Sequence, residues 1–444
     1  MTSADLSSVG PSPYRRVWRL AWPIIVSNST VPIVGLVDTG VVGHLGDPAF
    51  IGGVALGTLL FNYIFWGFGF LRMGTTGLAA QSFGADNHEE TKAVLGRALI
   101  MAVIFGITVL LLRSWIGEWG LGLLEGSSSV KNSASAYFEI CALAVPTALA
   151  NAAMLGWFLA LQDARSGLVQ QLVVNIVNVT LDFVLVIGFD MGVEGVAWAT
   201  VAAHTSGTLV SVFIVRRKLG GLSGEVHWAQ SLGFQKFCQI MVVNRDIFIR
   251  TVCLLTGTAF FMDRSAAMGE VVLAVNAILM NFQALSAFGL DGFAHAAEAL
   301  VGKSVGKRDA KALQEDVRAS SICGLYVSLL YMALFFFGGS LLVSLMTDIQ
   351  QVRDLAEGYI IWTVILPILS VWAYMFDGIF IGATRSVEMR NAMLVSFASF
   401  LVAGYFLVPM LDNHGLWLAY TFFMSMRGVT LWAYYGRVVA MAER

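Results

Sequence analysis

Charged residues are scarce in this chain. Asp, Glu, Lys and Arg make up 13% of its 444 residues, and the apolar set makes up 57%, whereas soluble globular chains contain about 25% charged residues. This composition excludes an ordinary soluble domain and favours a polytopic helical membrane protein, since twelve spans of about 20 to 25 residues would take roughly 240 to 300 residues. Because 27 basic residues are balanced by 29 acidic ones, the chain has no excess of positive charge for a nucleic-acid footprint, and nucleic acid is excluded as a main partner.

Cysteine is also rare, and the motifs of common enzymes are missing. The four cysteines are widely separated and form no CxxC pair, which excludes a disulfide framework and a zinc site. The sequence contains no P-loop, GxSxG, HExxH or GxGxxG motif, so we expect no nucleotide site, no bound metal, no cofactor and no enzymatic activity. Uphill transport by such a chain would have to be driven by an ion gradient.

Long apolar runs dominate what is present. The first follows Arg15, Arg16 and Arg19 and is too long for a signal peptide, so we interpret it as an uncleaved span. Apolar stretches bounded by charged or turn residues predict twelve spans, at residues 17–45, 51–80, 93–113, 134–161, 168–189, 192–215, 246–269, 271–301, 318–346, 353–383, 391–411 and 414–437. Most Lys and Arg then fall on one side, which predicts an integral membrane protein with both termini in the cytoplasm. We expect its location to be the bacterial cytoplasmic (inner) membrane.

The two halves of the chain repeat one another. The segment Leu78–Gly84 returns as Leu300–Gly306, and Gly156 returns as Gly378, at a shift of 222 residues. We therefore predict an N-terminal lobe at residues 1–215, a cytoplasmic linker at 216–245 and a C-terminal lobe at 246–444. Six spans in each lobe give both halves the same orientation, so the pseudo-two-fold axis runs along the membrane normal. Transporters use this arrangement to place a substrate cavity between two lobes.

Acidic residues within spans need an explanation, because a charge in hydrocarbon costs about 2.5 to 3.5 kcal/mol. Asp38 is surrounded by apolar residues and follows Pro23 and Pro32, either of which can bend the first helix. Spacings of three and four place Asn175, Asn178 and Asp182 on one helix face. We interpret Asp38 and Asp182 as functional; the alternatives are a structural carboxyl for Asp38 and helix-to-helix hydrogen bonding for the stripe.

The C-terminal half contains further acidic candidates. Asp291, His295 and Glu298 share a helix face, and local pairing with Arg72 or Arg427 is favoured over metal binding because no third ligand is nearby. Asp377 either faces the central cavity, where it would attract cations, or has a structural role. We therefore take Asp291, Glu298 and Asp377 as candidate residues of the substrate cavity. The GxxxG motif Gly53–Gly57 predicts close helix packing.

Three segments resemble the MATE (multidrug and toxic compound extrusion) family, and most closely its DNA-damage-inducible (DinF) branch. They are Leu36–Leu45, Phe70–Ala85 and Asp291–Glu298, and the resemblance covers essentially all predicted spans. It implies a V-shaped pair of six-helix lobes that exports organic, cationic or amphipathic compounds in exchange for H⁺ or Na⁺. The implied partners are small organic molecules and the lipid bilayer, and we expect a monomer.

The resemblance also implies a proton network in the N-terminal lobe. Its matching residues are Asp38, Tyr137, Asn178, Asp182 and Thr200, and Pro23 matches a proline proposed as a hinge. Protonation of Asp38, coupled to Asp182, is then expected to favour substrate release.

Two alternatives stay open. A lipid-linked-oligosaccharide flippase would need several cationic cavity residues, for which Arg72 and Arg427 are the candidates. A membrane enzyme acting on lipids would need a paired nucleophile and base.

Overall fold

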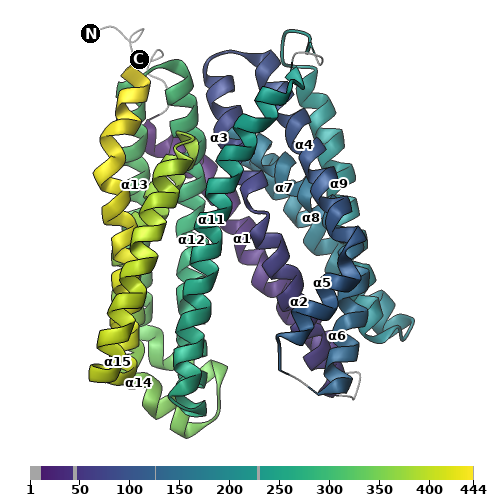
Figure 1. Cartoon of the computed structure of the whole chain (residues 1–444), viewed down its shortest axis with the longest axis vertical. Helices are drawn as coiled ribbons and strands as arrows, with labels where there is room; N and C mark the ends of the chain where they lie inside the picture. The colour runs from purple at the N-terminus through teal and green to yellow at the C-terminus, as the bar shows by residue number, and fades with distance from the viewer. Residues whose placement is uncertain (1–11, 44–47, 126, 228–230, 444) are drawn as a thin grey trace, which may run out of the picture. The chain divides into compact units, whose positions relative to one another are not determined.

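The computed structural model describes residues 12–43, 48–125, 127–227 and 231–443, and nearly all of them are helical (Figure 1). The elements, in chain order, are α1 (Pro13–Gly43), α2 (Pro48–Gly67), α3 (Phe70–Gly84), α4 (His88–Leu111), α5 (Arg113–Gly122), α6 (Ser128–Cys141), the short 3₁₀ turn η1 (Ala142–Ala144), α7 (Val145–Ala160), α8 (Ala164–Asp182), the π-helical segment η2 (Phe183–Gly188), α9 (Gly192–Leu219), α11 (Phe234–Ala267), α12 (Glu270–Lys307), α13 (Ala310–Met346), α14 (Gln350–Gly382) and α15 (Ser386–Glu443).

Contacts between residues divide the chain into two compact units. The N-terminal unit is Val26–Asn244, and the C-terminal unit combines the described residues up to Ile25 with Arg245 onward. Both α1 and α11 therefore begin in one unit and end in the other. The connection between α9 and α11 is shorter than the predicted linker, because α9 continues to Leu219 and α11 begins at Phe234. The lobe boundaries drawn from the sequence stay a prediction.

Ten helical segments among the described residues are long and apolar enough to cross a membrane. The predicted count of twelve is therefore not confirmed. One of the ten is α15, whose 58 residues contain a break at Asp412, so it covers two of the predicted spans. Another predicted span lies in α11, which carries Asp246, Arg250, Asp263 and Arg264 and is not among the ten. These charged residues, distributed along α11, lower its mean hydropathy.

The backbone confirms the internal repeat. In the part of the chain that the structure describes, six non-glycine residues have positive φ angles, and each one in the first half has a partner in the second half at the same shift of 222 residues. The pairs are Asp86 with Arg308, Gln162 with Thr384, and Asp190 with Asp412. Helix starts repeat too, since Asn87 caps α4 and Asp309 caps α13 through the backbone N–H three residues on. Since left-handed non-glycine residues are uncommon, this coincidence reflects one architecture used twice.

Glycines bring the same helices together in both units. In the N-terminal unit, a Cβ on Gly156 of α7 would overlap the backbone carbonyl of Arg72 on α3. In the C-terminal unit, a Cβ on Gly378 of α14 would overlap the backbone carbonyl of Ala294 on α12. Both residues of the second contact lie 222 positions after those of the first. The repeat seen in the sequence therefore marks an equivalent helix-to-helix contact in each unit.

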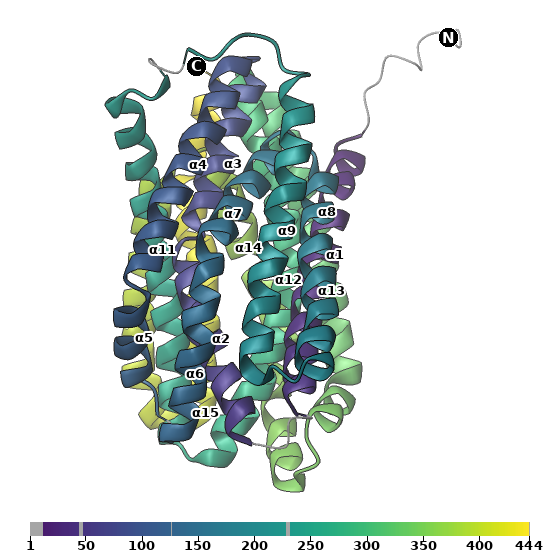
Figure 2. The ribbon, with the colours of Figure 1, turned by 90° about the vertical axis from the view of Figure 1, so that its right-hand side faces the viewer.

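Figure 2 faces the N-terminal unit, in which α2 packs along α6 and α8 packs along α9. A Cβ on Gly53 would lie 3.2 Å from the backbone nitrogen of Ala134, and one on Gly57 would lie 2.5 Å from Cδ1 of Tyr137. The GxxxG prediction is confirmed, since these two glycines allow α2 to approach α6.

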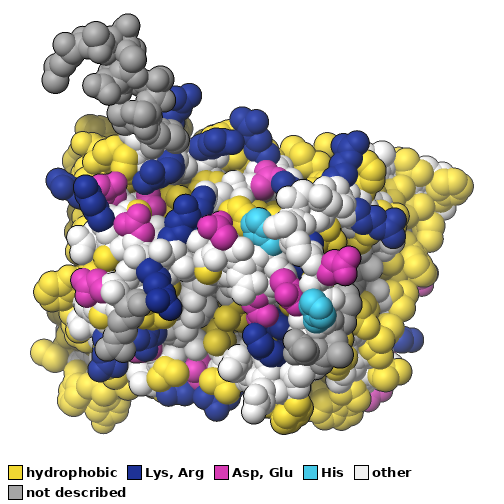
Figure 3. All heavy atoms as spheres, turned by 90° about the horizontal axis from the view of Figure 1, so that it is seen from above, with side chains coloured by type: hydrophobic (Ala, Val, Ile, Leu, Met, Phe, Trp, Pro, Cys, Tyr) yellow, Lys and Arg dark blue, Asp and Glu magenta, His cyan; other side chains and the backbone are white. Residues whose placement is uncertain are grey.

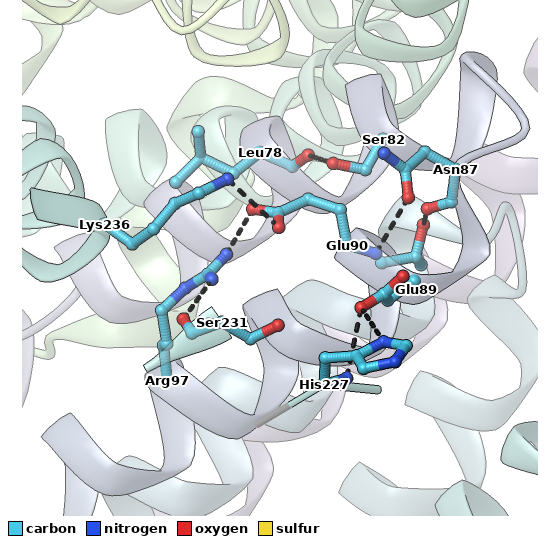
Figure 4. A network of polar contacts seen from close by, with 10 residues as sticks. Leu78, Ser82, Asn87, Glu89, Glu90, Arg97, His227, Ser231 and Lys236 are labelled. Carbon is cyan, nitrogen blue, oxygen red and sulfur yellow. Dashed lines mark hydrogen bonds and ion pairs between the residues drawn. The ribbon is translucent and has the colours of Figure 1, made fainter. Parts of the chain in front are cut away.

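Polar side chains attach the connection after α9 to the turn between α3 and α4 (Figure 4). Arg97, which is buried, donates to the backbone oxygen of Ser231 at 2.8 Å and also pairs with Glu90. Lys236 reaches the same carboxylate at 3.2 Å. The backbone N–H of His227 donates to Glu89 at 3.1 Å. These contacts fix the start of α11 within the N-terminal unit.

Candidate functional site

Two carboxyl groups meet inside the N-terminal unit. Asp182, the last residue of α8, is fully buried, and Asp38 on α1 is partly buried. The two side chains lie within hydrogen-bonding reach of each other. Among the described residues, both carboxyl oxygens of Asp182 and Oδ1 of Asp38 lack a hydrogen-bond donor. Because an ionised carboxylate only accepts, these three buried oxygens are left without a donor or a cation.

The stripe predicted on the fifth span is confirmed as one buried face of α8. Asn175, Asn178 and Asp182 are all buried, whereas Ile176 on the opposite face is exposed. The helix widens into the π-helical segment η2 directly after Asp182. Single π-turns inside α-helices occur frequently at functional sites, and the sequence had given no sign of this one.

Amides on the same face of α8 as Asp182 reach neighbouring helices. Asn178 donates from Nδ2 to the hydroxyl of Thr200 on α9 at 3.5 Å, and its own carbonyl oxygen has no partner among the described residues. Asn175 donates to the hydroxyl of Thr30 on α1 and accepts from Gln171 at 2.9 Å. The Asn175 to Thr30 bond therefore ties α1 to α8 on the side of the helix that carries Asp182.

Tyr137 completes the group from α6. It is buried, its hydroxyl accepts a hydrogen bond from Thr58 on α2 at 3.1 Å, and Asp38 acts on it electrostatically. Cys141 lies one turn further on α6, where it contacts Tyr137 and Thr200. Sequence reasoning missed Thr58, Thr30 and Cys141. The spacing of four between Tyr137 and Cys141 was a usable signal, but the cysteines were considered only as possible pairs.

Pro23 lies inside α1, and the helix continues through it. The change from the C-terminal to the N-terminal unit occurs two residues later, between Ile25 and Val26. A single helix thus carries Pro23 in one unit and Asp38 in the other. The role of Pro23 as a hinge stays a prediction.

The candidates in the C-terminal unit have different surroundings. Asp377 on α14 pairs with Arg427 of α15 at 2.6 Å and also with Arg250 of α11. Glu298 on α12 is fully buried, and Asp291 on the same helix is partly buried and acts electrostatically on Tyr374. The sequence favours pairing of the α12 acids with Arg72 or Arg427. Arg427 forms an ion pair with Asp377, and pairing of the α12 acids stays a prediction. The proposed roles of these three acids in a substrate cavity stay predictions.

The sequence of the chain is similar to a known family and to several curated proteins. The model of the family described as MatE matches residues 23–184 and 247–410. DNA damage-inducible protein F of Escherichia coli (strain K12) is 41% identical over 425 residues, which are 95% of this chain and 92% of that protein. The probable multidrug resistance protein NorM of Bacillus anthracis is 25% identical over 92% of this chain and 90% of its own length.

Solved structures show the same fold. A MOP superfamily transporter from Pyrococcus furiosus Vc1 (DSM3638) superposes with a TM-score of 0.88 at 16% identity, covering 98% of this chain and 97% of that one. A crystal structure of MATE in the straight conformation gives a TM-score of 0.87 at 18% identity, with 98% of each chain covered.

Proposed function

Because the chain belongs to the MatE family of membrane transporters, we propose that it exports organic, cationic or amphipathic compounds by antiport with protons across the bacterial cytoplasmic membrane. The family and its multidrug resistance relatives support efflux as the transport direction. Antiport, its coupling ion, the substrate class and the identity of the membrane are all proposed.

The observation that carries proton coupling is the missing donor between Asp38 and Asp182. One proton on either carboxyl supplies it and turns two repelling acceptors into a hydrogen-bonded pair. A sodium ion would instead need several oxygen ligands, which Asn178 and Thr200 would have to complete. One proton joins one oxygen of each carboxyl and removes the repulsion between them without any further ligand.

Protonation of this pair has a direct route to α1. Asp38 lies on that helix, and the bond from Asn175 to Thr30 holds the same helix against α8. In the outward-facing state, protonation changes the hydrogen bonds of α1 and favours release of the substrate. In the inward-facing state, loss of the proton restores a cavity that binds substrate. The proton drives this cycle only through its different affinity for the two states.

The charge distribution supports the proposed orientation. Lys and Arg side chains gather at the helix ends seen in Figure 3, which include the turn between α3 and α4. Cytoplasmic segments of membrane proteins carry an excess of these residues. We therefore place the turn between α3 and α4 on the cytoplasmic side, and the bias of Lys and Arg in the sequence predicts the cytoplasm for both termini as well.

Efflux from proteoliposomes tests the proposal. Purified protein is reconstituted with ethidium in the lumen, and either a pH gradient or a Na⁺ gradient is imposed alone. We expect drive by the pH gradient, lost in Asp38→Asn and Asp182→Asn. Asp263→Asn is the matched control, because Asp263 lies on α11, is exposed and pairs with the adjacent Arg264.

The other outcomes contradict proton coupling in different ways. Drive by Na⁺ alone would make the two aspartates ligands of a sodium ion. Retained pH-driven efflux in Asp38→Asn would remove that residue from the coupling site. Efflux driven by neither gradient would favour the lipid-linked flippase.

A further inference from the structure

We propose that Arg250 and Arg427 form a binding site for an anionic group, a carboxylate, sulfonate or phosphate carried by an amphipathic molecule. The site lies within the C-terminal unit, where α11, α14 and α15 meet around Asp377. The inference rests on the proposed export function for its biological meaning, because it adds an anionic group to the substrates named above.

Both guanidinium groups converge on one oxygen. Nη2 of Arg427 lies 2.6 Å from Oδ2 of Asp377, and Nη2 of Arg250 contacts the same atom. The arginines are 3% and 8% exposed, and Asp377 is 7% exposed. Two buried positive charges therefore share one carboxylate, which leaves the group of three with a positive charge.

Each arginine also has an unused donor. Among the described residues, Nε of Arg250 and Nε of Arg427 are buried and have no hydrogen-bond partner. A buried donor without an acceptor is costly, and more so on a charged group. A second anion would supply acceptors for these N–H groups, in the bidentate geometry that guanidinium groups favour with carboxylate and phosphate.

The neighbours of Arg427 hold it in place. The rings of Phe423 and Tyr374 lie 5.9 and 6.0 Å from its guanidinium carbon. Gln283 on α12 donates to the hydroxyl of Tyr374 at 3.1 Å. Asp291 adds a second negative charge near Tyr374, which offsets the positive charge of the two arginines. The selectivity for an anion therefore rests on the unused N–H donors of the arginines and not on net charge.

Asp377 acts in this site as an internal counter-ion. It neutralises one charge when the site is empty, and an incoming anion competes with it for the same guanidinium groups. Removing the charge of Asp377 should therefore strengthen anion binding, whereas removing either arginine should weaken it. A purely structural ion-pair cluster would not produce these opposite signs.

Binding of a matched pair of dyes tests the site. The probes are a rhodamine with a free carboxylate and its methyl ester, and affinity is measured by fluorescence anisotropy on the full-length protein in nonionic detergent, without a gradient. We expect the wild type to bind the carboxylate form about tenfold more tightly, in line with one charged hydrogen bond gained. Arg250→Gln and Arg427→Gln should lose this preference and bind the ester unchanged.

Further variants keep the test decisive if an arginine variant does not fold. Asp377→Asn should bind the carboxylate form more tightly than the wild type, and Arg250→Lys should retain part of the preference because it keeps the charge. Arg264→Gln, an exposed arginine on the same helix α11, should behave as wild type. Phosphatidylglycerol is then added to the micelles. If a lipid headgroup is the source of the anion, phosphatidylglycerol competes with the carboxylate dye; otherwise dye binding is unchanged.

Equal affinity for the two dyes would overturn the proposal, as would absence of binding of both. Equal losses for acid and ester in the arginine variants would overturn it too, as would weaker carboxylate binding by Asp377→Asn. Since these measurements need no ion gradient, loss of proton-driven efflux with an intact carboxylate preference would contradict the proposed coupling and leave this site standing.

Discussion

Gly378 allows the closest approach of α14 to α12, and a single methyl group should disrupt it. A Cβ at this position would lie 2.8 Å from the carbonyl carbon and 3.1 Å from Cα of Ala294, and would overlap the carbonyl oxygen. Because the obstacle is backbone, it cannot rotate away, so the two helices must separate. Overpacking of this kind costs about 1–3 kcal/mol, and we expect Gly378→Ala at the upper end.

Gly358 provides a matched control on the same helix. A Cβ there would meet nothing within 4 Å, so Gly358→Ala should only gain the helix propensity of alanine, up to about 1 kcal/mol. Both variants share that gain, and their difference in stability therefore isolates the overlap with Ala294.

Thermal unfolding in detergent, followed by tryptophan fluorescence, measures this difference. Gly378→Ala should unfold at a lower temperature than wild type, and Gly358→Ala at the same or a higher temperature. Gly156→Ala, the equivalent change in the N-terminal unit, should resemble Gly378→Ala. A Gly378→Ala protein as stable as Gly358→Ala would refute the packing argument.

Two further predictions concern polar contacts. Burial alone would raise the pKa of Asp163, but Lys218 and Ser166 outweigh this effect and hold the pKa below its ordinary value of 3.8. The ionised carboxylate therefore stabilises the fold at neutral pH. This contribution is lost as the pH falls through the lowered pKa. Asp163→Asn retains a side chain that can cap α8, so its unfolding temperature should be lower than that of wild type at pH 7, and the gap should close in acid; a gap independent of pH would contradict the assignment. Arg97→Gln should lose about 2 kcal/mol, because buried Arg97 donates to Glu90 and Ser231, whereas the more exposed Lys236→Gln should lose less than about 1 kcal/mol; equal losses in chemical unfolding would argue against a special role for Arg97.

Features set by one helix could be predicted from the sequence. The shared face of Asn175, Asn178 and Asp182 follows from helical periodicity, and the GxxxG contact of Gly53 and Gly57 follows from residue size. The repeat was visible as a constant shift because equivalent turns and close contacts require the same small or polar residues in both halves.

Features that depend on several distant helices could not be predicted. Arg250, Asp377 and Arg427 come from three helices, and nothing local in the sequence says that they meet. Thr58 reaches Tyr137 only because Gly57 lets α2 approach α6. The π-helical segment after Asp182 likewise lies in an apolar stretch that has no distinctive residue pattern.

Proton movement driven by a substrate gradient tests the central claim most directly. Proteoliposomes are loaded with ethidium and a lumenal pH indicator, diluted into dye-free buffer without any imposed ion gradient, and compared with protein-free liposomes. Antiport predicts that the lumen acidifies as the dye leaves, and that Asp38→Asn and Asp182→Asn abolish this acidification. Dye efflux through the wild type with no change in lumenal pH, or acidification that persists in both variants, would contradict the account.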